Sequence, residues 1–170
     1  FGKIPVLKHG SFVLYETAAI CRYIDDNFPG PRLSPVHTEK VALMNQWISV
    51  AMTRLDPNII RNFVIPMVFS DDETRNDPTF TVHMNKMADI IRQDLSILDQ
   101  AYAKGWICGE YFTIPDMMIM PMIHYVNAMP GGPEMLASAP NVADAFTRFK
   151  ARSAAAQTDP LLPEKLLKSA

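Results

Sequence analysis

The spacing of apolar residues changes once along this chain, at Thr17, and that change limits the folds open to it. Before it, residues 4–8 and 12–15 are short β-branched and aromatic runs on either side of a glycine, a pattern typical of a β-hairpin. In residues 17–28 the apolar side chains recur at helical spacing, and the Pro-Gly-Pro at 29–31 ends that helix. The chain therefore opens with a predicted strand–strand–helix unit, which must pack on another element because a lone hairpin is marginally stable.

Beyond a predicted linker at 31–40, the pattern is helical to the end of the chain. Apolar stripes at helical spacing cover residues 41–66 (with a bend near Pro57), 84–102, 114–128 and 142–154. Between these stripes, the polar residues 70–78 predict a loop, and the proline- and glycine-rich residues 129–133 predict an abrupt end to the preceding helix. The tail at 160–170 is expected to form one last turn against the helical body. The expected fold is mainly α: residues 1–30 form a β-β-α unit, and residues 41–170 form an all-α domain of about five helices.

Composition and charge narrow the classes of function. The chain has 48% hydrophobic and 20% charged residues and a net charge of −2, with both signs interspersed, so we expect neither a nucleic-acid nor a membrane partner. The apolar stretch from Met117 to Val126 is too short to span a bilayer. Cys21 and Cys108 form no disulfide framework, which favours a reducing, cytoplasmic compartment. The histidines show no ligand spacing, so we expect no metal.

Two short segments carry candidate ligand chemistry. In residues 2–7, Pro5 cannot donate to a β-ladder. If its peptide bond is cis, Ile4 presents its backbone N–H and C=O to a peptide-like ligand; otherwise Pro5 is an ordinary edge-strand proline. Where strand gives way to helix, Glu16 and Thr17 bring together a carboxylate, a hydroxyl and free backbone N–H groups. This combination suits a ligand's ammonium and carboxylate groups, and the alternative is a simple N-cap.

Together the two segments are more specific than either alone. A Gly-x-Ile-Pro-x-Leu strand followed by a Glu-Thr-x-Ala-Ile-x-x-Tyr-Ile helix start resembles the second half of the glutathione-binding domain of cytosolic glutathione transferases, which has a thioredoxin-like fold. The resemblance implies that Ile4, before a cis Pro5, clasps the cysteinyl backbone of glutathione. It also implies that Glu16 and Thr17 hold the γ-glutamyl end, with Thr17 in place of the commoner serine, and that Lys3 faces the glycyl carboxylate.

Two later segments extend the resemblance over nearly the whole chain. Thr113 and Asp116 form a variant capping box that matches the family's Gly-x-x-Phe-[Ser/Thr]-x-x-Asp sequence, and we expect this box to be structural rather than catalytic. Residues 140–153 resemble the family's last long helix, although Ser153 replaces a usual proline. The first strand, first helix and second strand of the glutathione-binding domain have no counterpart here, and the chain begins with Phe1 instead of Met. We therefore expect the family's catalytic Tyr, Ser or Cys to lie in a preceding segment.

The function implied by the resemblance is glutathione transfer in detoxification, in which the glutathione thiolate attacks a hydrophobic electrophile. The helix around residues 47–63 is expected to form much of the electrophile pocket. The methionines clustered at 117–122 are expected to be mostly core, with a share lining an adaptable pocket. The resemblance also implies a homodimer. Two alternatives stay open: a non-catalytic binding or interaction module with the same fold, and a glutathione-dependent reductase or isomerase.

Overall fold

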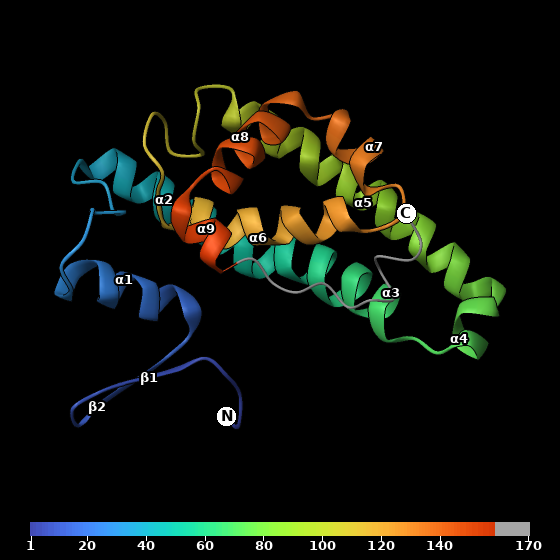
Figure 1. Cartoon of the computed structure of the whole chain (residues 1–170), viewed down its shortest axis with the longest axis horizontal. Helices are drawn as coiled ribbons and strands as arrows, with labels where there is room; N and C mark the ends of the chain where they lie inside the picture. Colours follow the sequence, from blue (N-terminus) through green and yellow to red (C-terminus); the bar gives the residue numbers. More distant parts are fainter. Residues whose placement is uncertain (159–170) are drawn as a thin grey trace.

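Residues 1–158 are described by the structure, a computed structural model, and they form a small β-β-α unit beside a larger helical body (Figure 1). The expected fold class is confirmed: short strands occur at the start of the chain, and helices make up the rest. None of the helices in this described range is both long and apolar enough to cross a bilayer. The last turn expected at 160–170 lies outside the described residues.

The β-β-α unit follows the change in apolar spacing. Strands β1 (Val6–His9) and β2 (Phe12–Tyr15) pair antiparallel, and Gly10 makes the tight turn between them with a φ of +61°. Helix α1 (Thr17–Asn27) follows at once and lies against β2 on one side and α6 on the other. Figure 1 shows this unit in blue, with α1 between the hairpin and the helical body.

A long helical rod begins the body. It consists of α2 (Thr38–Val50), η1 (Ala51–Val64) and α3 (Ile65–Phe69), joined without a loop because the junction residues keep helical backbone angles. The segment η1 is a π-helix, and at its end the Ile65 N–H donates to the carbonyl of Ile60, five residues earlier. Sequence spacing predicted a bend at the proline inside this segment. The structure has a wider helical turn at this proline, which is one way to accommodate a residue that lacks an N–H.

Two short helices were not expected from the sequence. Helix α4 (Asp72–Asn76) forms inside the predicted loop, where the Asp71 carboxylate caps it by accepting from the Thr74 N–H at 2.8 Å. Helix α7 (Gly132–Ala137) begins within the predicted break. Neither has the length for an apolar stripe to reveal it, so the loop and break predictions were wrong at these places.

The remaining helices enclose the core. They are α5 (Pro78–Tyr102), α6 (Ile114–Ala128), α8 (Pro140–Lys150) and α9 (Ser153–Gln157). The stripe expected over 142–154 is thus divided between α8 and α9. Helix α6 lies at the centre and packs on α2, η1, α7 and α8. The largest fully buried side chains are Met44, Leu55, Ile59, Ile91, Leu95, Leu98, Tyr102, Ile114, Ile119, Met120, Ile123 and Met129.

Candidate ligand-binding pocket

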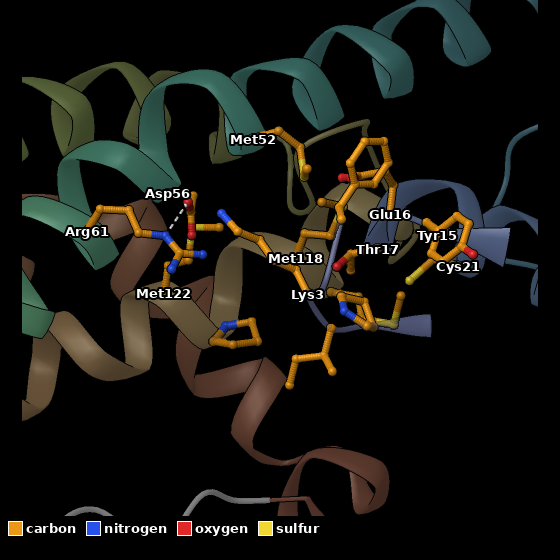
Figure 2. Close-up of a pocket in the computed structure, with 15 residues that line it drawn as sticks. Lys3, Tyr15, Glu16, Thr17, Cys21, Met52, Asp56, Arg61, Met118 and Met122 are labelled. Carbon is orange, nitrogen blue, oxygen red and sulfur yellow. Dashed lines mark hydrogen bonds and ion pairs between the residues drawn. The ribbon is translucent and has the colours of Figure 1, made fainter. Parts of the chain in front are cut away.

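A pocket of about 850 Å³ lies where the β-β-α unit meets η1 and α6 (Figure 2). We call it the methionine pocket. Its lining residues are Phe1, Lys3, Ile4, Pro5, Tyr15, Glu16, Thr17, Cys21, Met52, Asp56, Arg61, Met117, Met118, Pro121 and Met122. All five residues that the sequence singled out for glutathione are in this lining. The segments that supply them, 3–5 and 16–17, lie at the open end of the hairpin, next to the paired residues Val6 and Tyr15.

The first of those segments presents free backbone groups. The Ile4–Pro5 peptide bond is cis, as the sequence suggested. Ile4 is 93% exposed and precedes the β1–β2 ladder, and within residues 1–158 its backbone makes no hydrogen bond. The ladder begins only at Val6. The N–H and C=O of Ile4 are therefore available to an extended ligand that lies alongside this segment.

The second segment exposes a helix N-terminus. Glu16 has a φ of 69° and a ψ of 124°, an unusual backbone conformation for a residue with a side chain, and it costs about 1–3 kcal/mol. Its carbonyl accepts the first intrahelical bond, from the Ile20 N–H at 2.9 Å, yet its side chain makes no capping bond to α1. Glu16 is therefore the N-cap residue of α1 by its backbone, and its side chain does not cap the helix. The first-turn N–H groups and the Thr17 hydroxyl remain at a pocket where the helix dipole favours an anion.

The pocket wall formed by η1 and α6, which faces the β-β-α unit, is apolar except for one charged pair. Met52 comes from η1, while Met117, Met118 and Met122 come from α6, and such flexible thioether side chains adapt to ligands of different shape. Beyond them, Arg61 Nε donates to Asp56 Oδ2 at 3.0 Å. In Figure 2 the Lys3 side chain extends from the N-terminal segment toward this pair. The pocket thus has a carboxylate and a helix N-terminus at one end and two cations with one carboxylate at the other.

The sequence predicted the apolar part of this wall but not its charged pair. It placed a pocket along residues 47–63 and gave the 117–122 methionines a minor share in it, but it did not single out Asp56 or Arg61. These two residues are five apart, a spacing that does not bring side chains together on an α-helix. The π-helical turn of η1 places them within bonding distance, and no pattern in the sequence indicates that turn.

Cys21 also lines the methionine pocket and is a free thiol. Burial raises the pKa of the Cys21 thiol above its usual 9.0. Because the thiolate is the reactive form, Cys21 is poorly suited to act as a nucleophile at neutral pH. Among residues 1–158 there is no group of three or more His, Cys, Asp or Glu side chains placed to hold a metal ion.

Asp116 lies outside this pocket and has the structural role expected of it. Its buried carboxylate accepts from the Thr113 N–H at 2.8 Å, the Thr113 Oγ1–H at 2.6 Å and the Ile107 N–H at 3.0 Å. The capping box at the start of α6 is therefore confirmed. Burial raises the pKa of the Asp116 carboxyl, against the opposing effect of these hydrogen bonds.

Two family models match the chain. Residues 1–32 match "Glutathione S-transferase, N-terminal domain" and residues 60–157 match "Glutathione S-transferase, C-terminal domain". Glutathione S-transferase F10 of Arabidopsis thaliana is 23% identical over 157 residues, which are 91% of this chain and 72% of the relative. Glutathione S-transferase F14 of the same plant is 26% identical over 159 residues, 91% of this chain and 61% of the relative.

The fold is shared with solved structures. A mutant of poplar glutathione transferase F1 superposes with a TM-score of 0.79 at 24% identity, and the match covers 99% of this chain and 76% of the poplar chain. At this identity the superposition supports the fold and not the chemistry. The chain also spans less than two thirds of several curated relatives, including the 61% of F14.

Proposed function

We propose that this chain, which belongs to the glutathione S-transferase family, holds glutathione in the methionine pocket for conjugation to hydrophobic electrophiles. One observation carries the proposal. Groups suited to the two ends and the backbone of a peptide converge on the same 850 Å³ pocket, whose remaining lining includes four methionines. A volume of a few hundred to about 1,000 Å³ is typical of sites that enclose a small ligand.

Glutathione has three polar parts for which the pocket has matching groups. We assign the γ-glutamyl carboxylate to the Thr17 hydroxyl and the N-terminus of α1, and the γ-glutamyl ammonium to the Glu16 carboxylate. The unpaired N–H and C=O of Ile4 would bond the cysteinyl backbone in antiparallel fashion, with Pro5 setting the direction of the segment. Lys3 would pair with the glycyl carboxylate.

The methionine wall fits the second substrate. Met52, Met118 and Met122 offer a polarizable surface that suits hydrophobic molecules of varied shape. A base would first take the proton of the glutathione thiol. The resulting thiolate would attack an electrophilic carbon, forming a C–S bond while the bond from that carbon to a leaving group breaks and the leaving group departs with the electron pair. Stabilising the thiolate is the chemical step that requires a dedicated group. The raised pKa of Cys21 argues against that residue for this step.

The family and the two thiols support a proposal for the cellular setting. Both cysteines are free, as expected for a protein that works in the reducing cytoplasm, and we propose that location. We also propose a homodimer and a role in detoxification. The non-catalytic binding module and the reductase or isomerase remain the competing functions, because no pocket residue is assigned to thiolate activation.

The experiment separates these functions by measuring binding and turnover on the same protein at its full natural length. Calorimetric titration with glutathione tests the site, and spectrophotometric conjugation of chlorodinitrobenzene tests the reaction. Binding with turnover supports the transferase, and binding without turnover with this or other electrophiles supports the binding module. The absence of glutathione binding at millimolar concentration contradicts the proposed site.

A further inference from the structure

Arg61 and Asp56 form the one charged pair on the η1 side of the methionine pocket as described. Their bond uses only one edge of the guanidinium, since Arg61 Nε donates to Asp56 Oδ2 at 3.0 Å. Within residues 1–158, neither terminal nitrogen of Arg61 takes part in a hydrogen bond or an ion pair. The terminal N–H groups are therefore available to a ligand, and guanidinium N–H groups are strong donors to charged oxygens.

The Arg61 guanidinium is held in place before any ligand arrives. The Asp56 side chain that anchors it is 29% exposed, whereas the Arg61 side chain is 65% exposed. Both residues lie on η1, and the π-helical turn brings side chains five positions apart within bonding distance. The pair thus forms without help from another element. A donor fixed in this way does not have to be ordered during binding or reaction.

The methionine pocket separates this donor from the groups proposed to hold glutathione. In Figure 2 the Lys3 side chain extends toward the Asp56–Arg61 pair, and Met118 lies between that pair and Thr17. An electrophile that rests on Met118 would have glutathione on one side and Arg61 on the other. Negative charge that leaves the glutathione sulfur and passes through the electrophile then moves toward a cation, which lowers its energy.

Electrophiles differ in where this charge goes. When a thiolate adds to a conjugated enone or a nitroarene, a C–S bond forms and an electron pair moves onto the carbonyl or nitro oxygen. When a thiolate displaces a halide from an alkyl carbon, the C–S bond forms as the carbon–halogen bond breaks, and the pair leaves with the halide. Only the first kind of electrophile develops an oxyanion that a fixed N–H donor can stabilise.

We propose that Arg61 activates the second substrate, donating its terminal N–H groups to the carbonyl or nitro oxygen on which negative charge develops, while Asp56 positions the guanidinium. The favoured second substrates are therefore conjugated enones and nitroarenes rather than simple alkyl halides. The charge leaves the oxygen when the enolate carbon takes a proton from water, or when the nitroarene expels its leaving group with the electron pair. This inference rests on the proposed function, because glutathione supplies the thiolate.

The test uses 1,3,5-trinitrobenzene and glutathione with the protein at its full natural length. The thiolate adds to the ring, and because no leaving group is present the reaction stops at a coloured anionic adduct whose charge lies on the nitro oxygens. Absorbance titration gives the formation constant of the bound adduct without requiring turnover. Arg61→Gln should lower this constant about tenfold, less than the loss of a donor in an enclosed site, because the guanidinium is largely solvated.

Matched controls separate activation from general effects of charge or packing. Arg92→Gln removes another guanidinium that pairs with an aspartate, outside the methionine pocket, and should leave the formation constant unchanged. S-hexylglutathione enters the same pocket without a nitro group, and calorimetry should find its affinity for the Arg61→Gln protein unchanged. Asp56→Ala should also lower adduct formation, whereas Asp56→Asn keeps an oxygen acceptor for Arg61 Nε and should retain most of it.

Steady-state kinetics give a second measurement. In the Arg61→Gln protein, kcat should fall for the enone benzylideneacetone but not for benzyl chloride, with KM for glutathione unchanged. In a protein without turnover, the adduct measurement alone decides.

The outcomes distinguish this inference from the proposed function. Equal adduct formation constants for the Arg61→Gln and Arg92→Gln proteins would overturn the role of Arg61. So would equal losses of adduct and S-hexylglutathione binding in Arg61→Gln, or a protein that binds glutathione but forms no more adduct than free glutathione does. Calorimetry that finds no glutathione binding at all would contradict the proposed function, and this inference would fall with it.

Discussion

Arg54 Nε donates to Asp94 Oδ1 at 2.6 Å and joins η1 to α5. Asp94 is only 1% exposed, whereas the Arg54 side chain is 49% exposed, so the pair has one buried and one solvated partner. Asn58 Nδ2 donates to the second carboxylate oxygen of Asp94 at 2.7 Å. The buried carboxylate of Asp94 is thus hydrogen-bonded by two side chains of the π-helix. Because only the carboxylate is buried, removing the Arg54 cation would leave an unpaired anion in the core.

Replacing Arg54 by methionine should therefore lower the free energy of unfolding by about 2–3 kcal/mol, because a buried carboxylate loses its charged partner. Urea denaturation followed by circular dichroism measures the change. Arg92→Met is the matched control, since its pair with Asp89 is exposed on both sides and should matter by about 0.5 kcal/mol or less. Similar losses in the two variants would mean that the Asp94 carboxylate is adequately solvated without Arg54.

Asp116 should make stability depend on pH in a particular direction. Its folded pKa is raised above the ordinary 3.8, so the folded state holds this proton more tightly than the unfolded state does. The tighter proton binding of the folded state adds to the free energy of unfolding. This added stability is fully present below the unfolded pKa and is lost as pH rises from there through the folded pKa. In Asp116→Asn this dependence is absent. The stability advantage of the natural protein over the variant should shrink as pH rises from about 3.5 to 7, as measured by urea midpoints. An advantage that grows with pH would show that hydrogen bonding outweighs burial at this carboxyl.

Gly132 should tolerate no side chain. A Cβ atom there would lie 1.9 Å from the Val126 carbonyl oxygen, and the neighbour in this contact is backbone rather than a flexible side chain. Gly132→Ala should therefore cost at least about 1–3 kcal/mol of stability through overpacking, detected as a lower thermal midpoint. Gly30→Ala provides the comparison, because nothing lies within 4 Å of a Cβ at that position. A Gly132→Ala protein as stable as the Gly30→Ala protein would mean that the start of α7 shifts freely.

Thr17→Ala should weaken glutathione binding roughly tenfold or more while the fold stays intact. One hydrogen bond to a charged group is worth about 1.5–3 kcal/mol, and within residues 1–158 the Thr17 hydroxyl makes no hydrogen bond that the substitution would remove. Calorimetric titration measures the affinity. Thr38→Ala makes the same change at the first residue of α2, outside the methionine pocket, and should leave affinity as it was. Equal affinities in both variants would reduce Thr17 to a residue that only begins a helix.

Much of the fold could be predicted because local interactions specify it. The two apolar periods located the hairpin and α1, and the stripe over 114–128 gave α6 with its observed bounds. The capping box needs only Thr113 and Asp116, three residues apart, so sequence alone revealed it. The short helices α4 and α7 escaped prediction because a five- or six-residue helix has too few turns for a stripe.

The same distinction between local and long-range interactions applies to the candidate ligand pocket. The sequence by itself predicted Lys3, Ile4, Pro5, Glu16 and Thr17 as glutathione ligands, through the resemblance of one strand, turn and helix start that follow one another along the chain. Only the tertiary structure decided what faces them. No local spacing in the sequence predicts the π-helical turn that pairs Asp56 with Arg61 in this pocket. The same holds elsewhere in the fold for the 2.9 Å contact between Lys40 and the Cys108 carbonyl. This contact joins residues 68 positions apart, and such contacts form only when packed helices bring distant segments together.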